Sequence, residues 1–402
     1  MAESLPHSKV ALGITGGIAA YKSAALARLL VTAGYEVFPI MTPWATRFAG
    51  PLTFEAICRH KVRVETPAAG DPDSIEHIAL VRQADLLVIA PLTANTMAKM
   101  ANGLADNFLT NAYLAHTGLT LACPAMNTAM LSHPASQRNL AKLQDDGVHL
   151  LHGTSGDLAC GEVGAGRMAE PEVIFDKIVQ LTSPKVAGIE GKQVLISAGP
   201  TCEDLDPVRF LTNRSSGKMG IALAKALRNA GAKVTLVHGP VSLALPSGME
   251  TVSVRTAADM ASAMFDRQAS ADIVIMAAAV ADYRPEKHSQ KLKKGSFDGV
   301  LHLQRTTDIL AELGKRKTGH QHLIGFAAES QHLLANAQRK LEAKNLSIIF
   351  ANPIDEEDSG FGVDQNQVVA ISRSGKTTDL GRQSKANLAV SMVKLMAETL
   401  FP

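Results

Sequence analysis

The chain has 402 residues, of which 46% are hydrophobic, and its formal net charge is +2. This length is enough for two domains with separate cores, and the nearly balanced charge gives no reason to expect nucleic acid or another polyanion as a partner. No apolar run approaches the roughly 20 residues that cross a bilayer, and no signal peptide is evident. We therefore expect a soluble cytoplasmic protein that does not bind membranes.

Two segments of the chain begin alike, with a strand, a turn of small residues and a helix. The first has a strand at 10–14, the turn Thr15-Gly16-Gly17, a helix at 18–33 and a strand at 36–41. The second has a strand at 193–197, the turn Ala198-Gly199-Pro200, a polar insertion at 201–216, a helix at 217–230 and a strand at 233–238. Each beginning predicts its own α/β domain.

Further short apolar runs are typical of buried parallel strands. They lie at 85–90, 119–123, 272–279, 323–328 and 346–351, followed by a hairpin at 367–379 and a helix at 385–400. The Pro- and Gly-containing stretch before Lys192 divides the chain near residue 190. We therefore predict two Rossmann-like α/β domains with parallel sheets, at 1–190 and 191–402, with ligands at the carboxyl ends of the strands.

Neither turn has the features of two common nucleotide sites. The Gly-x-Gly-x-x-Gly fingerprint is absent, and Thr42 and Gly239 stand where a dehydrogenase has an acidic residue. Residues 215–218 resemble a phosphate loop, but Thr212 stands where that loop needs glycine and Met219 replaces the magnesium-binding hydroxyl. The sequence therefore argues against a nicotinamide dehydrogenase and a P-loop NTPase.

The first turn suits a phosphate monoester, because Thr15, Gly16 and Gly17 leave N–H groups at the opening of a helix. The alternative is a tight turn without a ligand. Two loops of small and polar residues, at 90–96 and 124–127, follow neighbouring predicted strands and favour a ligand site.

These motifs resemble those of known families. Residues 16–22, 90–96 and 124–127 are similar to the flavin-containing cysteine decarboxylases. His77 and the segment 159–168 narrow the resemblance to the phosphopantothenoylcysteine decarboxylases. Residues 206–209, 212–220, 277–284 and 291–294 resemble the phosphopantothenate-cysteine ligases. Together they cover nearly the whole chain, in the order of the bacterial bifunctional enzymes of coenzyme A biosynthesis.

For the first half, the resemblance implies decarboxylation with FMN as electron sink. His77 is expected to act as a base or to orient the substrate carboxylate, Asn127 to hold that carboxylate, and Cys160 to donate a proton from a lid. The alternative for His77 is a structural role, and the alternative for Asn127 is a turn or helix cap. The other expected FMN and substrate contacts are Thr15, Gly16, Gly17, Thr42, Ala90, Thr93, Asn95, Ala125 and Met126. Cys58 and Cys123 sit in apolar runs and are expected to be small core residues.

For the second half, the resemblance implies ligation of cysteine through an acyl-cytidylate made from CTP. Arg209 and Asn213 are expected to contact the substrate or intermediate, Lys218 a phosphate, and Lys291 to be catalytic in a basic run at 284–294. The expected CTP contacts are Ala277, Ala278, Asp282, Lys291, Thr307, Asp308, Ile309, Leu310, Phe326, Lys340 and Lys344. Mg²⁺ is implied by the triphosphate. For the basic run, the alternative is a solvated face without a ligand. For the insertion at 201–216, the alternative is a long loop before a helix that Ser215 or Ser216 caps.

The sequence departs from the ligases in three places: Thr306-Thr307 replaces Asn-Pro, Cys202 replaces an arginine, and the basic run is shorter, which leaves Lys287 as the alternative to Lys291. Two other functions remain open for the first half. One is a different FMN enzyme of the same fold, such as a flavin prenyltransferase, and the other is a flavin-binding regulatory subunit. The resemblance also implies a homo-oligomer, a dodecamer built from decarboxylase trimers and ligase dimers.

Overall fold

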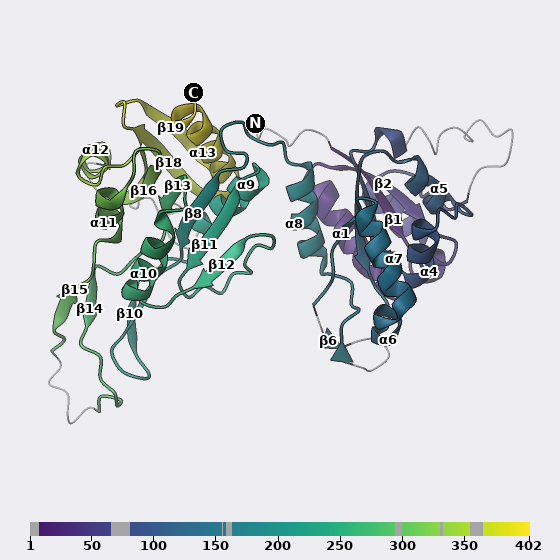
Figure 1. Cartoon of the computed structure of the whole chain (residues 1–402), viewed down its shortest axis with the longest axis horizontal. Coiled ribbons are helices and arrows are strands. Elements are labelled where there is room, and N and C mark those ends of the chain that lie inside the picture. The colour runs from purple at the N-terminus through teal and green to yellow at the C-terminus, as the bar shows by residue number, and fades with distance from the viewer. Residues whose placement is uncertain are drawn as a thin grey trace. The chain divides into compact units, whose positions relative to one another are not determined.

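The computed structural model describes residues 8–65, 81–154, 156–157, 163–293, 300–329, 333–353 and 365–402. The chain forms two compact units, residues 1–183 and 184–402 (Figure 1). None of the helices in these described ranges is both long and apolar enough to cross a bilayer.

The first unit is built on a five-stranded parallel sheet with the order β2-β1-β3-β4-β5. Its strands are β1 (Lys9–Ile14), β2 (Glu36–Met41), β3 (Leu86–Leu92), β4 (Leu119–Pro124) and β5 (His149–Leu150). Its helices are α1 (Ala20–Thr32), the short 3-10 helix η1 (Ala45–Arg47), α2 (Pro51–Cys58), α4 (Ala94–Ala101), α5 (Phe108–Ala115), α6 (Thr128–Ser132), α7 (Pro134–Asp145) and α8 (Pro171–Thr182).

Helices cover both faces of this sheet, which explains why β1 has no polar side chain from Val10 to Ile14. Val10, Leu12 and Ile14 belong to the core that contains α1, α2 and α8. Ala11 points the other way, into the core with α4, α5 and α7. Alternate side chains of one strand thus serve two cores.

The second unit has an eight-stranded sheet with the order β12-β11-β8-β13-β16-β17-β18-β19. Its strands are β8 (Gln193–Ala198), β11 (Lys233–His238), β12 (Glu250–Ser253), β13 (Ile273–Met276), β16 (His322–Glu329), β17 (Ile348–Pro353), β18 (Gln365–Ser372) and β19 (Thr377–Ser384). The first six are parallel, whereas β18 and β19 run antiparallel and have a register shift between Gln367 and Val369. Helices α9 (Lys218–Asn229) and α13 (Lys385–Leu400) pack on one face, and α10 (Ala257–Gln268), α11 (Ile309–Arg316) and α12 (Leu333–Ala343) on the other.

Among the described residues, three short hairpins lie outside the two large sheets. They are β6 (Gly156–Asp157) with β7 (Val163–Gly164), β9 (Cys202–Asp204) with β10 (Phe210–Thr212), and β14 (Tyr283–Pro285) with β15 (Leu303–Arg305). The last two belong to the second unit and project from the same end of its sheet (Figure 1). The polar insertion that the sequence places at 201–216 therefore contains the β9–β10 hairpin.

The expected fold class is confirmed, with differences at the edges of elements. The strand expected at 272–279 is shorter, because β13 ends at Met276. The units divide between Ser183 and Pro184 rather than near residue 190. Val186 N–H donates to the Ala230 carbonyl (3.1 Å), Gly191 N–H donates to the Gly231 carbonyl (3.0 Å), and Ile189 is buried in a core of the second unit. These contacts place residues 184–190 in the second unit.

Each sheet has one point where the strand order reverses direction along the chain. In the first unit it lies between β1 and β3, and in the second between β8 and β13. The loops that leave neighbouring strands at such a point turn apart, which opens a crevice at their carboxyl ends. The two small-residue turns, after Ile14 and after Ala198, are both located there.

Candidate active sites

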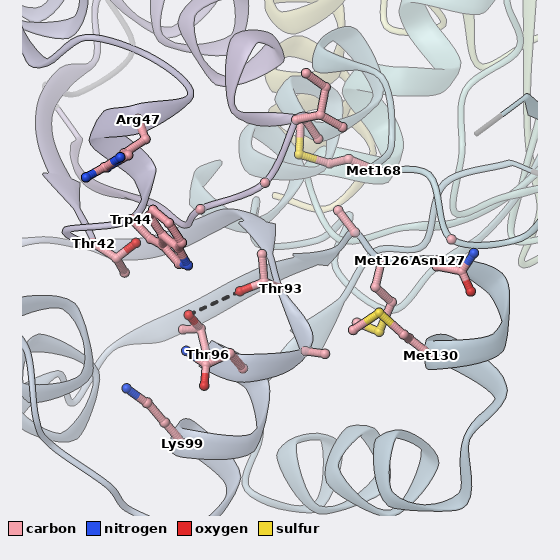
Figure 2. A pocket seen from close by; sticks show the side chains of 18 of the residues that line it. Thr42, Trp44, Arg47, Thr93, Thr96, Lys99, Met126, Asn127, Met130 and Met168 are labelled. Atoms are coloured by element: carbon pink, nitrogen blue, oxygen red, sulfur yellow. Dashed lines mark hydrogen bonds between the residues drawn. The ribbon is translucent and has the colours of Figure 1, made fainter. Parts of the chain in front are cut away.

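A cavity of about 1180 Å³ opens at the switch point of the first unit. It brings together most of the residues expected to contact FMN and substrate: Gly16, Gly17, Thr42, Thr93, Asn95, Ala125, Met126 and Asn127. In Figure 2, Thr42 lies on the left, Thr93 near the middle, and Met126 and Asn127 on the right. The loops after β1, β2, β3 and β4 thus supply the walls of a single site.

The turn after β1 is closely packed from behind. A Cβ atom on Gly16 would lie 2.7 Å from the Trp44 Cβ and 3.0 Å from the Trp44 backbone carbon, so a side chain has no room there. Helix α1 begins directly afterwards, and Ala19 at its N-cap provides no side-chain cap. Within the described residues the backbone N–H groups of Gly16 and Gly17 have no protein acceptor. The turn is therefore suited to bind an anion.

Two expected contacts, Thr15 and Ala90, lie behind the cavity instead of in its lining, and both are fully buried. The Thr15 hydroxyl donates to the Pro91 carbonyl (2.7 Å) and accepts from the Thr93 N–H (3.1 Å). The Ser23 hydroxyl donates to the Ala90 carbonyl (2.6 Å). The two bonds of Thr15 hold the ends of β1 and β3 together, and the Ser23 bond joins α1 to β3, so both expected contacts help to shape the site.

Several cavity residues were not expected from the sequence. Trp44 is 63% exposed and lines the cavity beside Arg47, whose guanidinium lies 5.4 Å from the indole centre. Lys99 pairs with Asp106, and this hydrogen bond holds the pKa of the Asp106 carboxyl below its usual range. Trp44 is the only tryptophan and stands two residues after Thr42, which is the sequence signal that could have identified it.

The Asn127 loop is joined to the segment that follows the β6–β7 hairpin. Met126 N–H donates to the Gly166 carbonyl (3.0 Å), and a Cβ on Gly166, whose φ is +126°, would lie 2.1 Å from the Met126 oxygen. Asn127 caps α6 by accepting from the Ala129 N–H (2.8 Å). Asn127 therefore caps a helix, as the alternative interpretation of the sequence expects, and it also lines the cavity.

Two expected catalytic residues of this unit, His77 and Cys160, lie outside the described residues. The described strands β6 and β7 flank residues 158–162 on either side. Gly166 and Arg167, which follow β7, line the cavity.

In the second unit, residues 279–281 connect several expected site residues. The Asn213 amide donates to the Ala279 carbonyl (3.0 Å) and the Val280 carbonyl (3.2 Å). The Thr306 hydroxyl donates to the Ala281 carbonyl (2.6 Å). The structure thus places Asn213 and the Thr306-Thr307 segment against the loop that leaves β13.

The turn after β8 depends on two glycines with positive φ. Gly199 and Gly217 have φ of +78° and +77°, and a Cβ on Gly217 would lie 3.2 Å from the Gly199 Cα. Gly217 is the N-cap of α9, while Ser215 accepts from the Gly217 N–H (3.3 Å). The alternative with Ser215 or Ser216 as the N-cap is therefore wrong. Lys218 is the first residue of α9, at the end of the helix that favours phosphate.

The expected nucleotide residues include an ion pair. Lys344 lies 2.8 Å from an Asp308 carboxylate oxygen, and Asp308 caps α11 by accepting from the Ala311 N–H (3.0 Å). Burial raises the pKa of the Asp308 carboxyl, but the hydrogen bond from Lys344 and the nearby charge of Lys340 outweigh it and hold the pKa below its usual value. Lys344 therefore contacts Asp308 directly, and Lys340 is near enough for its charge to act on the same carboxyl. Ile309 is buried in the core, so only its backbone can reach a ligand.

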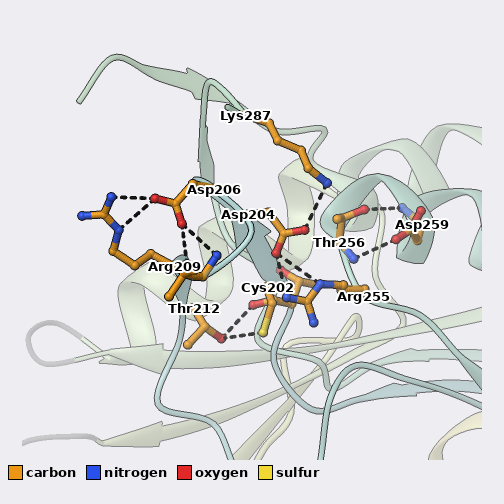
Figure 3. Close-up of polar contacts among 11 residues, drawn as sticks. Cys202, Asp204, Asp206, Arg209, Thr212, Arg255, Thr256, Asp259 and Lys287 are labelled. Carbon is orange, nitrogen blue, oxygen red and sulfur yellow. Dashed lines mark hydrogen bonds and ion pairs between the residues drawn. The ribbon is translucent and has the colours of Figure 1, made fainter. Parts of the chain in front are cut away.

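Arg209 and Lys291 have different surroundings. The Arg209 guanidinium donates to Asp206 from Nε (3.0 Å) and Nη2 (2.6 Å), as Figure 3 shows. These bonds and three backbone N–H donors hold the pKa of the Asp206 carboxyl well below its usual range. Lys291 is exposed and has no recorded partner among the described residues, whereas Lys287 pairs with Asp204 (3.2 Å).

Two family models cover the chain. One, described as Flavoprotein, matches residues 2–183, and the other, described as DNA/pantothenate metabolism flavoprotein C-terminal domain, matches residues 189–400. The coenzyme A biosynthesis bifunctional protein CoaBC of Bacillus subtilis is 45% identical, over 98% of this chain and 97% of that protein. The CoaBC protein of Vibrio parahaemolyticus is 40% identical, over 99% and 100%. This chain belongs to the family of coenzyme A biosynthesis bifunctional proteins.

A solved structure is also similar. The crystal structure of the C-terminal domain of a CoaBC protein is 41% identical and covers 52% of this chain and 98% of that chain, with a TM-score of 0.45. The family expected from the motifs is confirmed, and this chain is a bifunctional enzyme of coenzyme A biosynthesis. The flavoprotein model corresponds to the unit that contains the cavity.

Proposed function

We propose that the second unit joins cysteine to 4'-phosphopantothenate with CTP, and that the first unit converts the resulting 4'-phosphopantothenoylcysteine to 4'-phosphopantetheine and CO2 with FMN. The observation that carries this proposal is the cavity at the switch point of the unit that matches the flavoprotein model. A cavity of about 1180 Å³ can hold a flavin together with part of a substrate.

The residues of the first unit fit FMN. Gly16 and Gly17 would hold its phosphate at the opening of α1, and Thr42, Thr93 and Asn95 are in the lining. Bound FMN supplies an electron sink, which the loss of CO2 from a cysteine carboxylate requires. Asn127 would hold the substrate carboxylate, His77 would act as base or orient that group, and Cys160 would return a proton to the product. A thiol with an ordinary pKa of about 8.5 is protonated at neutral pH, which suits a proton donor.

The second unit would activate the carboxylate of phosphopantothenate, because forming an amide in water is uphill. Asn213 and Arg209 would contact the substrate, and Lys291 would act on the reacting phosphate. That Lys287 is paired with Asp204 while Lys291 is exposed favours Lys291 for this role. Asp308, Lys340 and Lys344 would lie at the nucleotide.

We propose that Mg²⁺ enters with CTP, as triphosphates bring the ion with them. Among the described residues no group of three or more His, Cys, Asp or Glu side chains is arranged to hold a metal ion. Triphosphate oxygens and water would then supply most of its ligands.

One incubation tests both steps. Purified protein with 4'-phosphopantothenate, cysteine, Mg²⁺ and CTP should yield 4'-phosphopantetheine and CO2, with less product when ATP replaces CTP. Release of CO2 from added 4'-phosphopantothenoylcysteine tests the first unit alone, and its absence from FMN-loaded protein would favour a regulatory flavin subunit. A protein that cannot be loaded with FMN would contradict the assignment of the cavity.

We further propose a homo-oligomer in which the first units form trimers and the second units form dimers, twelve chains in all. Large apolar side chains at the mouth of the first site support a partner surface there, since Ile18 and Tyr21 are each 62% exposed. Light scattering after size-exclusion chromatography should give twelve times the mass of one chain, and a monomer would contradict this part of the proposal.

A further inference from the structure

The β9–β10 hairpin holds a segment of the basic run at 284–294 through three consecutive residues. Lys287 pairs with Asp204 (3.2 Å), His288 N–H donates to the Leu205 carbonyl (2.9 Å), and Leu292 N–H donates to the Asp206 carboxylate (3.2 Å). We call residues 286–293, with these three contacts, the docked basic segment. It lies between the strands β14 and β15 in sequence, so the docking joins one hairpin to the other.

The contact at Leu292 involves both polar groups of its backbone. Asp206 Oδ2 accepts from the Leu292 N–H, and Arg209 Nη2 donates to the Leu292 carbonyl (2.9 Å). Arg209 is itself oriented by Asp206, which it meets through Nε and Nη2. Asp206 and Arg209 together therefore recognise one peptide residue without using its side chain.

Both carboxylate oxygens of Asp206 accept hydrogen bonds in this arrangement. Its residue is 2% exposed, and its other oxygen, Oδ1, accepts the N–H groups of Val208 and Arg209 at 2.8 Å each. Every group that faces the carboxylate is a donor, so an amide in its place would direct an N–H against another donor in either orientation. This makes Asp206→Asn a sharp test with almost no change of volume.

Lys291 immediately precedes the fixed residue. Consecutive Cα atoms are about 3.8 Å apart, so fixing Leu292 restricts where the Lys291 side chain can start. Lys291 is exposed, and no partner of its ammonium group is recorded in the described parts of the chain. The docking therefore fixes where the Lys291 side chain starts, while its ammonium group has no partner among the described residues.

We propose that Asp206 is a positioning residue of the ligase, which acts through Arg209 and the Leu292 backbone to hold Lys291 at the reacting phosphate. This inference rests on the proposed ligase function and on Lys291 as its catalytic lysine. Positioning of this kind mainly affects kcat, because a displaced group loses the alignment needed in the transition state.

A double-mutant cycle separates positioning from a general structural role. Asp206→Asn should lower kcat for ligation about 30-fold and change the KM for CTP less than about threefold. In a Lys291→Ala background, Asp206→Asn should lower kcat for ligation less than about threefold, because there is no longer a lysine to position. If the two losses multiply, Asp206 does not act through Lys291 and the inference is overturned. A Lys291→Ala variant with full activity would overturn it as well.

The first unit of the same chain provides the control for folding. FMN absorbance and CO2 release from 4'-phosphopantothenoylcysteine should be unchanged in Asp206→Asn. Asp259→Asn is the matched variant, since Asp259 is a carboxylate of the second unit that caps α10 and has no recorded contact with the docked basic segment. It should change ligation less than about twofold. A wild-type chain that fails to ligate with any nucleotide would instead contradict the proposed function.

Proteolysis gives a readout that is independent of activity. Trypsin cleaves after lysine, and the Lys291–Leu292 bond carries the N–H that Asp206 holds. Cleavage at this bond should be several times faster in Asp206→Asn than in wild type, while cleavage sites in the first unit keep their rates. Equal cleavage at Lys291 in the two proteins would show that the docking does not hold this bond.

Discussion

The two units place a site at the same position of an α/β sheet but build it differently. In the first, the site is formed by close backbone packing, as when Gly16 meets Trp44 and Thr15 joins the ends of two neighbouring strands. In the second, hairpins are held in place by side-chain pairs such as Asp206 with Arg209. The first site therefore tolerates little added side-chain volume, whereas the second depends on side-chain pairs that a single substitution can break.

The largest expected effect tests the preformed site. Gly16→Val should abolish FMN binding and lower decarboxylation by more than about 100-fold, because the new side chain has no space against Trp44. Flavin absorbance of the purified protein and CO2 release would measure this. Gly50→Ala is the control, since a Cβ at Gly50 meets nothing within 4 Å. Retention of flavin by Gly16→Val would show that the close packing is not required.

A smaller effect is expected at the nucleotide side of the second site. Asp308→Asn removes the carboxylate that holds Lys344 and attracts Lys340. We therefore expect the KM for CTP to rise about tenfold, with a smaller change in kcat. Initial rates over a range of CTP concentrations would show it. Glu312→Gln, which removes a half-buried carboxylate of the same helix α11 that pairs with Lys315 and Arg316, should leave the KM unchanged. Equal effects of both variants would refute the role of Asp308.

Trp44 offers a more moderate test of the first site. Because it is the only tryptophan and lines the cavity, its emission should be quenched as FMN is added to the flavin-free protein. Trp44→Phe keeps an aromatic ring but loses area, and should weaken FMN binding about fivefold, the size of one aromatic contact. Unquenched emission at saturating FMN would place the flavin away from this wall.

The last test concerns pH and the core of the first unit, and it measures stability and accessibility instead of binding or catalysis. Burial raises the pKa of the Cys58 thiol to about 11. An acid whose pKa is raised in the folded state stays protonated as pH rises past its unfolded value of about 8.5, so its contribution to stability is lost between about pH 8.5 and 11. Alkylation of Cys58 at pH 8, followed by mass spectrometry, should be at least about 100-fold slower than in urea. Similar rates would mean that Cys58 is accessible.

The sequence predicts the regular elements well where one pattern dominates. Strands at 36–41 and 233–238 and the helix at 385–400 coincide with β2, β11 and α13. Buried parallel strands and an amphipathic helix with a clear start have strong periodic signals, which explains the agreement. Eight of the residues that the family resemblance implies as FMN or substrate contacts line one cavity in the structure.

Features that depend on contacts distant in sequence could not be predicted in this way. Asp206 and Leu292 are separated by 86 positions, and nothing local to either residue indicates their hydrogen bond. The N-cap of α9 is another case: Ser215 and Ser216 are better caps by propensity, but the close approach of Gly199 favours Gly217 at that position. Tertiary packing decided both.

The last strand of the larger sheet limits how chains can associate. An edge strand has free backbone groups that can pair with another protein. In β19, however, polar residues such as Thr377 and Arg382 are exposed, and Gly381 has positive φ. The pairing of β19 with β18 also has a register shift. These features discourage the growth of a sheet from one molecule into the next. A continuous intermolecular sheet is therefore disfavoured at this edge, whereas β12 forms the other edge of the same sheet.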